Sequence, residues 1–189
     1  FVLIQLPRLA IYVGFAATPL VVFYPFAKRV TWFPQFVLGL TFSWGVFLGW
    51  TAVTASLPPF SVTFIYAGCV FWVFGYDTIY AIQDMEDDRA VGIKSSALAF
   101  KDQISLGIGT AYAIAIGLIA VGLFLHGNDE FQSVIFGWAG LAGMAIHLGI
   151  QIQKIRIDNA ELALKLFKSN RNAGLLLLAG LVLDRLFTG

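Results

Sequence analysis

Long apolar runs separated by short polar connections make up most of this chain. Six of them approach the roughly 20 residues that a helix needs to cross a hydrocarbon core, namely residues 9–27, 32–54, 60–81, 104–125, 131–151 and 173–187. The runs are continuously apolar and do not alternate over about ten residues, which favours helices over barrel strands. The pattern predicts an all-α, polytopic transmembrane helix bundle with six spans, forming a single domain over residues 1–189.

Composition supports a membrane protein and excludes other classes. The chain is 59% hydrophobic and 12% charged, with a formal net charge of +1, whereas soluble domains are about half apolar and a quarter charged. The basic residues are too few and too scattered for a surface that neutralises nucleic-acid phosphates, so we expect no nucleic-acid partner. The single cysteine, Cys69, lies among apolar neighbours, which excludes a disulfide framework and a thiolate metal site.

The basic residues alternate between the predicted connections. Ten of the twelve Lys and Arg residues fall in the first, third and fifth connections, and the second and fourth contain none. Because Lys and Arg concentrate on the inner side of a membrane, we expect the odd-numbered connections to face the cytoplasm or the mitochondrial matrix. Within the fifth connection, residues 152–172, spaced apolar side chains indicate an interfacial amphipathic helix, whose polar end at residues 169–172 would cap the last span.

Two other patterns predict structural roles. Gly45 and Gly49 in the second span form a Gly-xxx-Gly pair, which permits close packing between helices. His126 lies in an even-numbered connection and His147 lies within a span, far from the acidic residues in any simple bundle. We expect both histidines to be structural and not to bind a metal.

A cluster of acidic residues ends the third apolar run. Five of the eleven Asp and Glu residues fall within twelve positions, 77–88. A carboxylate near hydrocarbon costs roughly several kcal/mol unless a cation offsets it. On a continuous α-helix, Asp77, Asp84 and Asp88 fall within roughly 20° of one line, and Tyr80 lies about 60° to one side. Asp87 flanks this stripe.

The acidic stripe predicts a divalent-cation site. Carboxylates at this spacing repel one another unless a cation bridges them, and oxygen-only ligands favour Mg²⁺ or Mn²⁺ over zinc. A solvated acidic cap is the alternative, but Asp77 lies two turns inside the apolar run. Arg89, Lys94 and Lys101 follow at once and supply cations for the oxygens of a departing diphosphate. A more distant alternative is a divalent-cation channel or carrier with the acidic stripe as its binding ring.

Several segments resemble one protein family. YDTIYAIQDMEDDRAVGIKSSAL, residues 76–98, resembles the second aspartate-rich motif of the UbiA superfamily of intramembrane prenyltransferases, particularly the 4-hydroxybenzoate polyprenyltransferases. YPFAKRVTWFPQ at residues 24–35, LGLTFSWGVFLGWTAV at 38–53 and LFKSNRNAG at 166–174 are similar to the same subfamily. Family members have nine helices and a first motif of Asn-Asp-xxx-Asp type, which this chain does not contain. The six spans would match helices four to nine, so we expect a fragment that lacks the N-terminal third.

The resemblance implies a reaction and a set of residues. It implies Mg²⁺-dependent transfer of a polyprenyl group from a polyprenyl diphosphate to an aromatic acid, 4-hydroxybenzoate in ubiquinone biosynthesis. Asp84 and Asp88 would bind Mg²⁺ (or Mn²⁺), with Asp87 and Asp77 supporting them, and Tyr80 would orient the site or stabilise a developing cation. The candidates for holding the diphosphate are Lys28, Arg29, Arg89 and Lys94.

The same resemblance leaves the acceptor and the membrane open. Homogentisate, a naphthoate and haem are the alternative acceptors, because the same metal site could serve each of them. The membrane would be the inner membrane of a bacterium or of a mitochondrion, with the aspartate motif on the cytoplasmic or matrix side. We therefore expect the chain to be embedded in the lipid bilayer, which counts as one of its partners.

Overall fold

The computed structural model describes residues 3–129 and 134–187, in which the secondary structure is helical and includes no strand. The predicted all-α class is therefore confirmed. The helices are α1 (Arg8–Ala16), α2 (Thr18–Val30), α3 (Pro34–Ser43), α4 (Gly45–Thr54), α5 (Phe60–Tyr80), α6 (Met85–Val91), α7 (Ser96–Phe100), α8 (Ile104–Asp129), α9 (Ile135–Lys154) and α10 (Ala160–Phe187), with 3-10 turns η1 (Leu3–Gln5) and η2 (Lys101–Gln103).

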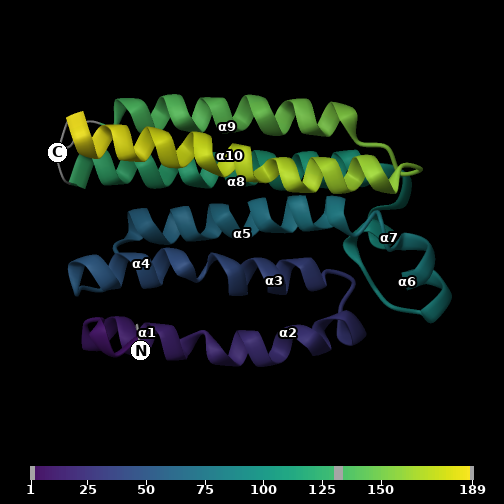
Figure 1. Ribbon diagram of the computed structural model, residues 1–189, viewed down its shortest axis with the longest axis horizontal. Helices are drawn as coiled ribbons and strands as arrows, with labels where there is room; N and C mark the ends of the chain where they lie inside the picture. The colour runs from purple at the N-terminus through teal and green to yellow at the C-terminus, as the bar shows by residue number, and fades with distance from the viewer. Residues whose placement is uncertain (1–2, 130–133, 188–189) are drawn as a thin grey trace.

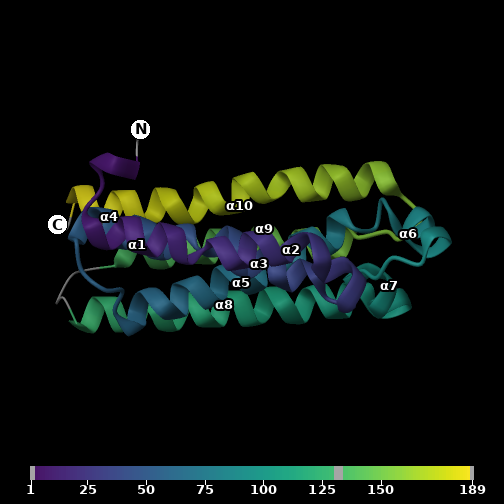
Figure 2. The same ribbon diagram turned by 90° about the horizontal axis from the view of Figure 1, so that it is seen from below.

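The long helices run side by side as one bundle. Figure 1 shows α1 and α2 along one edge, α3 and α4 next to them, α5 in the middle, and α8, α9 and α10 along the other edge. In Figure 2, α10 and α8 lie on opposite sides of the layer that contains α5. The most extensive helix contacts join α5 to α8, α9 to α10 and α3 to α5. The central helix α5 therefore has neighbours on several faces.

Two of the apolar runs fold as pairs of helices joined by a bend. The first run bends at Ala17, before Pro19, and the second bends at Trp44. At the first bend, the backbone N–H of Ala17 donates to Gly14 (3.3 Å), and the Trp44 indole N–H donates to the carbonyl oxygen of Val13 (2.8 Å). A neighbouring helix thus supplies a donor at the bend, as backbone groups inside a membrane require.

Five helical segments of the described residues are long and apolar enough to cross a membrane: Arg8–Val30, Pro34–Thr54, Phe60–Tyr80, Ser96–Gly127 and Ile135–Lys154. The predicted span at 131–151 begins outside the described residues, and α9 starts at Ile135. The predicted span at 173–187 is the second half of α10, a single helix of 28 residues with charged side chains near both ends. An interfacial helix with a polar cap at residues 169–172 was therefore the wrong expectation.

Polar side chains of α10 lie inside the bundle, which explains why this helix continues through its polar segment. Asn170 is 5% exposed, and its Oδ1 accepts a hydrogen bond from the Trp72 indole N–H (3.0 Å). The Tyr112 hydroxyl donates to Gln151 Oε1 (2.8 Å), and Gln151 Nε2 donates to Ser169 Oγ (2.8 Å). These contacts connect α5, α8, α9 and α10, so the polar segment is part of the core and not a loop.

The two histidines also take part in helix packing. His147 Nε2 lies 3.2 Å from Ser169 Oγ, within hydrogen-bonding distance, and the His126 ring packs edge-on against Trp50 at 6.5 Å between centroids. These contacts are those of structural residues.

Asp184 of α10 lies beside the first turn of α9 and connects the two helices there. Its carboxylate accepts hydrogen bonds from the backbone N–H groups of Phe136 (2.8 Å) and Gly137 (2.5 Å), in the first turn of α9. The first turn of a helix has N–H groups without intrahelical partners, and a carboxylate there also interacts favourably with the helix dipole. Asp184 therefore caps α9 from a neighbouring helix.

Glycines bring α9 and α10 close together. A Cβ atom at Gly140 would lie 2.6 Å from the carbonyl oxygen of Leu176, and one at Gly180 would overlap the carbonyl oxygen of Phe136. At Gly45 and Gly49, in contrast, a Cβ atom would have nothing within 4 Å. Within the described part of the chain, the predicted packing role of the Gly45–Gly49 pair is therefore wrong.

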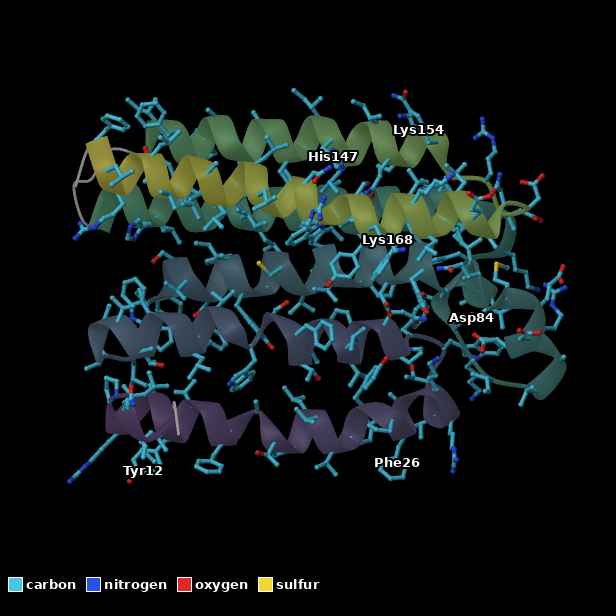
Figure 3. The ribbon with its side chains drawn as sticks, viewed as in Figure 1. Tyr12, Phe26, Asp84, His147, Lys154 and Lys168 are labelled. Atoms are coloured by element: carbon cyan, nitrogen blue, oxygen red, sulfur yellow. The ribbon has the colours of Figure 1, made fainter. Side chains whose placement is uncertain are left out.

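The connections alternate between the two ends of the bundle, as the basic residues predicted. The α2–α3 connection, the α5–α8 connection with α6 and α7, and the α9–α10 connection lie at one end (Figure 1). We call it the motif end, because Asp84 lies there, as does Lys154 (Figure 3). The α4–α5 connection lies at the other end.

Candidate active site

The acidic segment is broken into two helices. α5 ends at Tyr80, a turn covers residues 81–84, and α6 begins at Met85. The backbone hydrogen bonds of the turn span three residues instead of the four of an α-helix. They join Ile82 N–H to the carbonyl oxygen of Ile79 (3.2 Å) and Gln83 N–H to that of Tyr80 (3.0 Å). The acidic stripe was predicted on the assumption of one continuous helix, and that assumption is wrong. The chain bends here because Ile82 and Met85, 4% and 9% exposed, pack into the core across the end of the bundle.

The break nevertheless brings three of the four predicted acidic residues together. One cavity of about 60 Å³ lies between α2, α3, α5 and α6 at the motif end, and we call it the aspartate cavity. Its lining residues are Tyr24, Lys28, Pro34, Gln35, Asp77, Tyr80, Ala81, Asp84 and Asp88. Four predicted catalytic residues and one predicted diphosphate ligand, Lys28, thus face the same small space. Figure 3 shows Asp84 at this end of the bundle.

Hydrogen bonds hold the α6–α7 segment against α3 and α5. The backbone N–H of Ser96 donates to Gln35 Oε1 (3.1 Å), and the hydroxyl oxygens of Ser96 and Thr78 lie 2.7 Å apart. Gln35 and Thr78 are both buried. Since α6 is connected to α7 by a short loop, these bonds also restrain the position of Asp88.

Lys94 fixes the same segment to the α2–α3 connection. Its backbone N–H donates to the carbonyl oxygen of Lys28 (3.4 Å), and its Nζ donates to that of Val30 (3.4 Å). The Nζ also lies 5.8 Å from the centre of the Trp32 ring, which is a cation–π distance. The structure therefore places the Lys94 ammonium against the α2–α3 connection and not in the lining of the aspartate cavity.

Asp88 is the buried carboxylate of α6. It is 8% exposed, and burial raises its pKa above the usual value. The charge of Lys28 and a hydrogen bond from Ser95 act in the opposite direction, and the charges of Asp84 and Asp87 raise the pKa further. The ionised form of Asp88 therefore depends on nearby positive charge, and Lys28 supplies part of it.

Three other predicted residues lie outside the aspartate cavity. Asp87 and Arg89 line a separate cavity of about 660 Å³, where α6 approaches the start of α10, together with Asp158. Adjacent residues of a helix point about 100° apart, which directs Asp87 away from Asp88. Arg29 is exposed at the end of α2. The structure does not place these three side chains in the lining of the aspartate cavity.

The carboxylates of the aspartate cavity suit a metal ion that also binds water or substrate oxygens. In residues 3–129 and 134–187, no three His, Cys, Asp or Glu side chains are grouped closely enough to hold a metal ion by themselves. Mg²⁺ prefers oxygen ligands and usually combines one or two carboxylates with water and substrate phosphates. The pair Asp84 and Asp88, both lining one cavity, fits that incomplete set.

Aromatic rings extend from the cavity along α5. Trp72, Tyr76 and Tyr80 are spaced by four residues and so share one face of the helix. The Phe167 ring of α10 packs on Tyr76 and Tyr80, with centroids 5.7 Å and 4.9 Å away. Tyr80 is therefore held from the side while it lines the aspartate cavity.

Sequence reasoning missed Tyr24, Gln35 and Ser95. Tyr24 and Gln35 line the aspartate cavity, and Ser95 bonds to Asp88. The available signal was the segment YPFAKRVTWFPQ, which begins at Tyr24 and ends at Gln35, with Lys28 between them.

Comparison with known proteins decides the family. The sequence pattern of the UbiA prenyltransferase family matches residues 1–178. The chain belongs to the UbiA prenyltransferase family. It is 42% identical over 189 residues to the mitochondrial 4-hydroxybenzoate polyprenyltransferase of Rattus norvegicus, covering 98% of this chain and 48% of the relative. The protein of the same name from Arabidopsis thaliana is 41% identical over 192 residues, covering 98% and 44%.

The fold of this UbiA chain also matches a solved structure. The apo structure of a UbiA homolog from Aeropyrum pernix K1 superposes with a TM-score of 0.74 and 20% sequence identity, covering 97% of this chain and 66% of that one. The predicted UbiA-like bundle is thus confirmed. The chain spans about half the length of the curated relatives that it matches.

Proposed function

We propose that this chain carries the second aspartate motif of a prenyltransferase, which transfers a polyprenyl group from a polyprenyl diphosphate to 4-hydroxybenzoate. The observation that carries the proposal is the aspartate cavity. There, Asp77 of α5, Asp84 of the turn and Asp88 of α6 meet Lys28 of α2. Membership of the UbiA family and the names of the relatives support the reaction and its acceptor.

Five residues of the cavity have a chemical task in this reaction. Asp84 and Asp88 would hold Mg²⁺, which would supply the positive charge that stabilises the diphosphate as a leaving group. Lys28 donates hydrogen bonds to the diphosphate oxygens and at the same time balances the charge of Asp88. Asp77 supports the two ligands from the last turn of α5.

The prenyl group is transferred as a cation. The bond between its first carbon and the diphosphate oxygen breaks, and the electron pair leaves with the diphosphate. The Tyr80 ring, held by Phe167, faces the cavity and stabilises the allylic cation through its π electrons. The acceptor ring carbon ortho to the hydroxyl forms the new carbon–carbon bond, and loss of the ring proton restores aromaticity.

The substrate explains why this chemistry takes place in a membrane. Burying each CH₂ group contributes about 0.8 kcal/mol, so a long polyprenyl tail is concentrated in the bilayer. We place the protein in the inner membrane of a bacterium or a mitochondrion, and the relatives named as mitochondrial support this. The basic residues of the odd-numbered connections support a cytoplasmic or matrix location for the motif end.

The test is prenyl transfer by the intact protein with Asp84→Asn or Asp88→Asn. With radiolabelled polyprenyl diphosphate and 4-hydroxybenzoate, each change is expected to lower product formation at least about 100-fold, because a metal ligand is lost. Asp158→Asn is the matched control, since Asp158 is exposed at the same end of the bundle. A chelator should abolish activity, and Mg²⁺ or Mn²⁺ should restore it.

Two results would overturn parts of the proposal. Full activity of either aspartate variant would show that the cavity does not bind the catalytic metal. Faster prenylation of homogentisate, a naphthoate or haem than of 4-hydroxybenzoate would keep the site and change the acceptor.

A further inference from the structure

A long apolar groove lies on the side of the bundle between α3 and α8. Its floor is a cluster of five phenylalanine rings with centroids 5.6–6.3 Å apart, namely Phe33, Phe36, Phe71, Phe74 and Phe100. Three hollows of about 320, 510 and 350 Å³ are lined by these rings. The first two share Phe71 and Phe74 and the last two share Phe33, so they form one continuous surface, which we call the phenylalanine groove.

The phenylalanine groove is separate from the aspartate cavity. None of the residues that line the three hollows also lines the aspartate cavity. On α5, Phe71 and Phe74 point roughly 150° away from the face of Trp72 and Tyr76, which contacts α10. The groove is therefore a surface distinct from the cavity that holds Asp84 and Asp88.

The length and openness of the groove match one leaflet of a bilayer. Along η2 and α8 it extends from Gln103 to Ile114, which is about 16 Å at 1.5 Å per residue. Half of a hydrocarbon core of about 30 Å is about the same length. Leu106 and Ile114 on its wall are 66% and 39% exposed, so the groove is open sideways to a lipid chain.

The groove ends in positive charge at the motif end. Lys101 lines the third hollow together with Trp32 and Phe33, and the Lys94 ammonium lies over the Trp32 ring. Among the described residues, the single ion pair joins Glu161 and Lys165. Neither Lys94 nor Lys101 is therefore paired with a carboxylate of the described residues. Lys101 also has a φ of 46°, a left-handed conformation that is costly for a residue other than glycine.

We propose that the phenylalanine groove binds one anionic phospholipid from the leaflet at the motif end. An acyl chain packs on Phe71 and Phe74, and the headgroup phosphate accepts hydrogen bonds from Lys94 and Lys101. Because hydrocarbon is also available in the bilayer, the selectivity comes from the two ammonium groups and from close packing on the aromatic floor. Trp32, 49% exposed, lies at the boundary where membrane-interface aromatics are common.

The test measures lipid retention by native mass spectrometry of the protein in detergent. Wild type is expected to retain one phosphatidylglycerol and to lose phosphatidylcholine with the same acyl chains. The double variant Lys94→Gln/Lys101→Gln should bind phosphatidylglycerol about 25-fold more weakly, about fivefold for each lysine. Lys154→Gln is the matched control, because Lys154 is an exposed lysine at the same end on α9.

A second variant tests the acyl-chain part of the site without changing its charge. Thr110→Trp fills the hollow between α5 and α8, where Thr110 is an exposed lining residue, and should also lower retention. Glycerol phosphate, which has no acyl chains, should not compete for binding. Equal retention by wild type and the lysine double variant, equal loss in Lys154→Gln, or no preference over phosphatidylcholine would each overturn the proposal. Competition by glycerol phosphate, or full retention by Thr110→Trp, would overturn the acyl-chain contact.

Discussion

Asn170 shows how a single polar residue connects the helices of this bundle. Its Oδ1 accepts the Trp72 indole N–H and lies 3.5 Å from the Tyr112 hydroxyl, and its Nδ2 donates to two carbonyl groups of α10. Three of the four hydrogen-bonding positions of the amide are therefore in use, because the single Tyr112 hydroxyl proton is donated to Gln151 at the shorter distance. The neighbouring Phe167 packs on Tyr80, so Asn170 also helps to fix the wall of the aspartate cavity.

Replacing Asn170 with Leu should lower the free energy of unfolding by about 1–3 kcal/mol. The change leaves the Trp72 N–H without its acceptor in a buried place, and that cost exceeds the gain from an added apolar side chain. Unfolding of the purified protein in detergent measures the effect. Asn172→Leu is the control, because Asn172 is exposed two residues away and should change stability by less than about 0.5 kcal/mol. Similar losses in both variants would contradict the role of Asn170.

At the residue scale, the sequence predicted acidic residues better than their partners. Asp77, Asp84 and Asp88 were identifiable because they are close along the chain and lie at the edge of an apolar run. Gln35 and Ser96 are 61 positions apart, and Trp72 and Asn170 are 98 positions apart. Such pairs are set by tertiary packing, which no local pattern contains. Asn170 consequently looked like part of a polar cap.

At the scale of helices, apolar length predicted where helices lie but not how they end or pack. The runs at 60–81 and 104–125 closely match α5 and most of α8. The sequence did not predict the break at residues 81–84, because the break depends on the packing of Ile82 and Met85 into the hydrophobic core. Gly45 and Gly49 match the Gly-xxx-Gly packing motif, but no atom of a neighbouring helix in the described chain lies within 4 Å of the place where a Cβ would stand. Gly140 and Gly180, in contrast, allow close contact between α9 and α10.

Gly140→Val should separate α9 from α10 and lower the free energy of unfolding by about 1–3 kcal/mol. The new side chain would meet the Leu176 carbonyl oxygen, and a backbone atom cannot move aside as a flexible side chain does. Gly149→Val on the same helix is the control, since a Cβ atom there has nothing within 4 Å. Thermal unfolding in detergent compares the two. If both variants melt at the same temperature, close approach at Gly140 does not stabilise this helix pair.

At the scale of the whole molecule, the alternation of charge describes how the chain crosses the membrane. The odd-numbered connections carry the basic residues, and the structure brings them to the motif end. The aspartate cavity and the charged end of the phenylalanine groove lie at that same end. Charge and helix length were sufficient for this arrangement because both act over whole helices and do not depend on side-chain contacts.

Labelling of single cysteines tests this topology. In a Cys69→Ala background, Ser56→Cys in the α4–α5 connection and Asp158→Cys in the α9–α10 connection should react with a membrane-impermeant thiol reagent from opposite sides. Both positions are exposed, so each cysteine is accessible. Asp158→Cys should react from the cytoplasmic or matrix side. Reaction of both cysteines from one side would require an odd change in the number of spans between them.

The contact between Asp184 and the first turn of α9 has a consequence for biogenesis. If α9 entered the bilayer alone, the N–H groups of Phe136 and Gly137 would lack the Asp184 acceptor, and α10 alone would bring a carboxylate to the membrane boundary without these donors. Together, each helix supplies what the other lacks. We therefore expect α9 and α10 to enter the bilayer as a hairpin, with α10 supplying the cap that α9 needs.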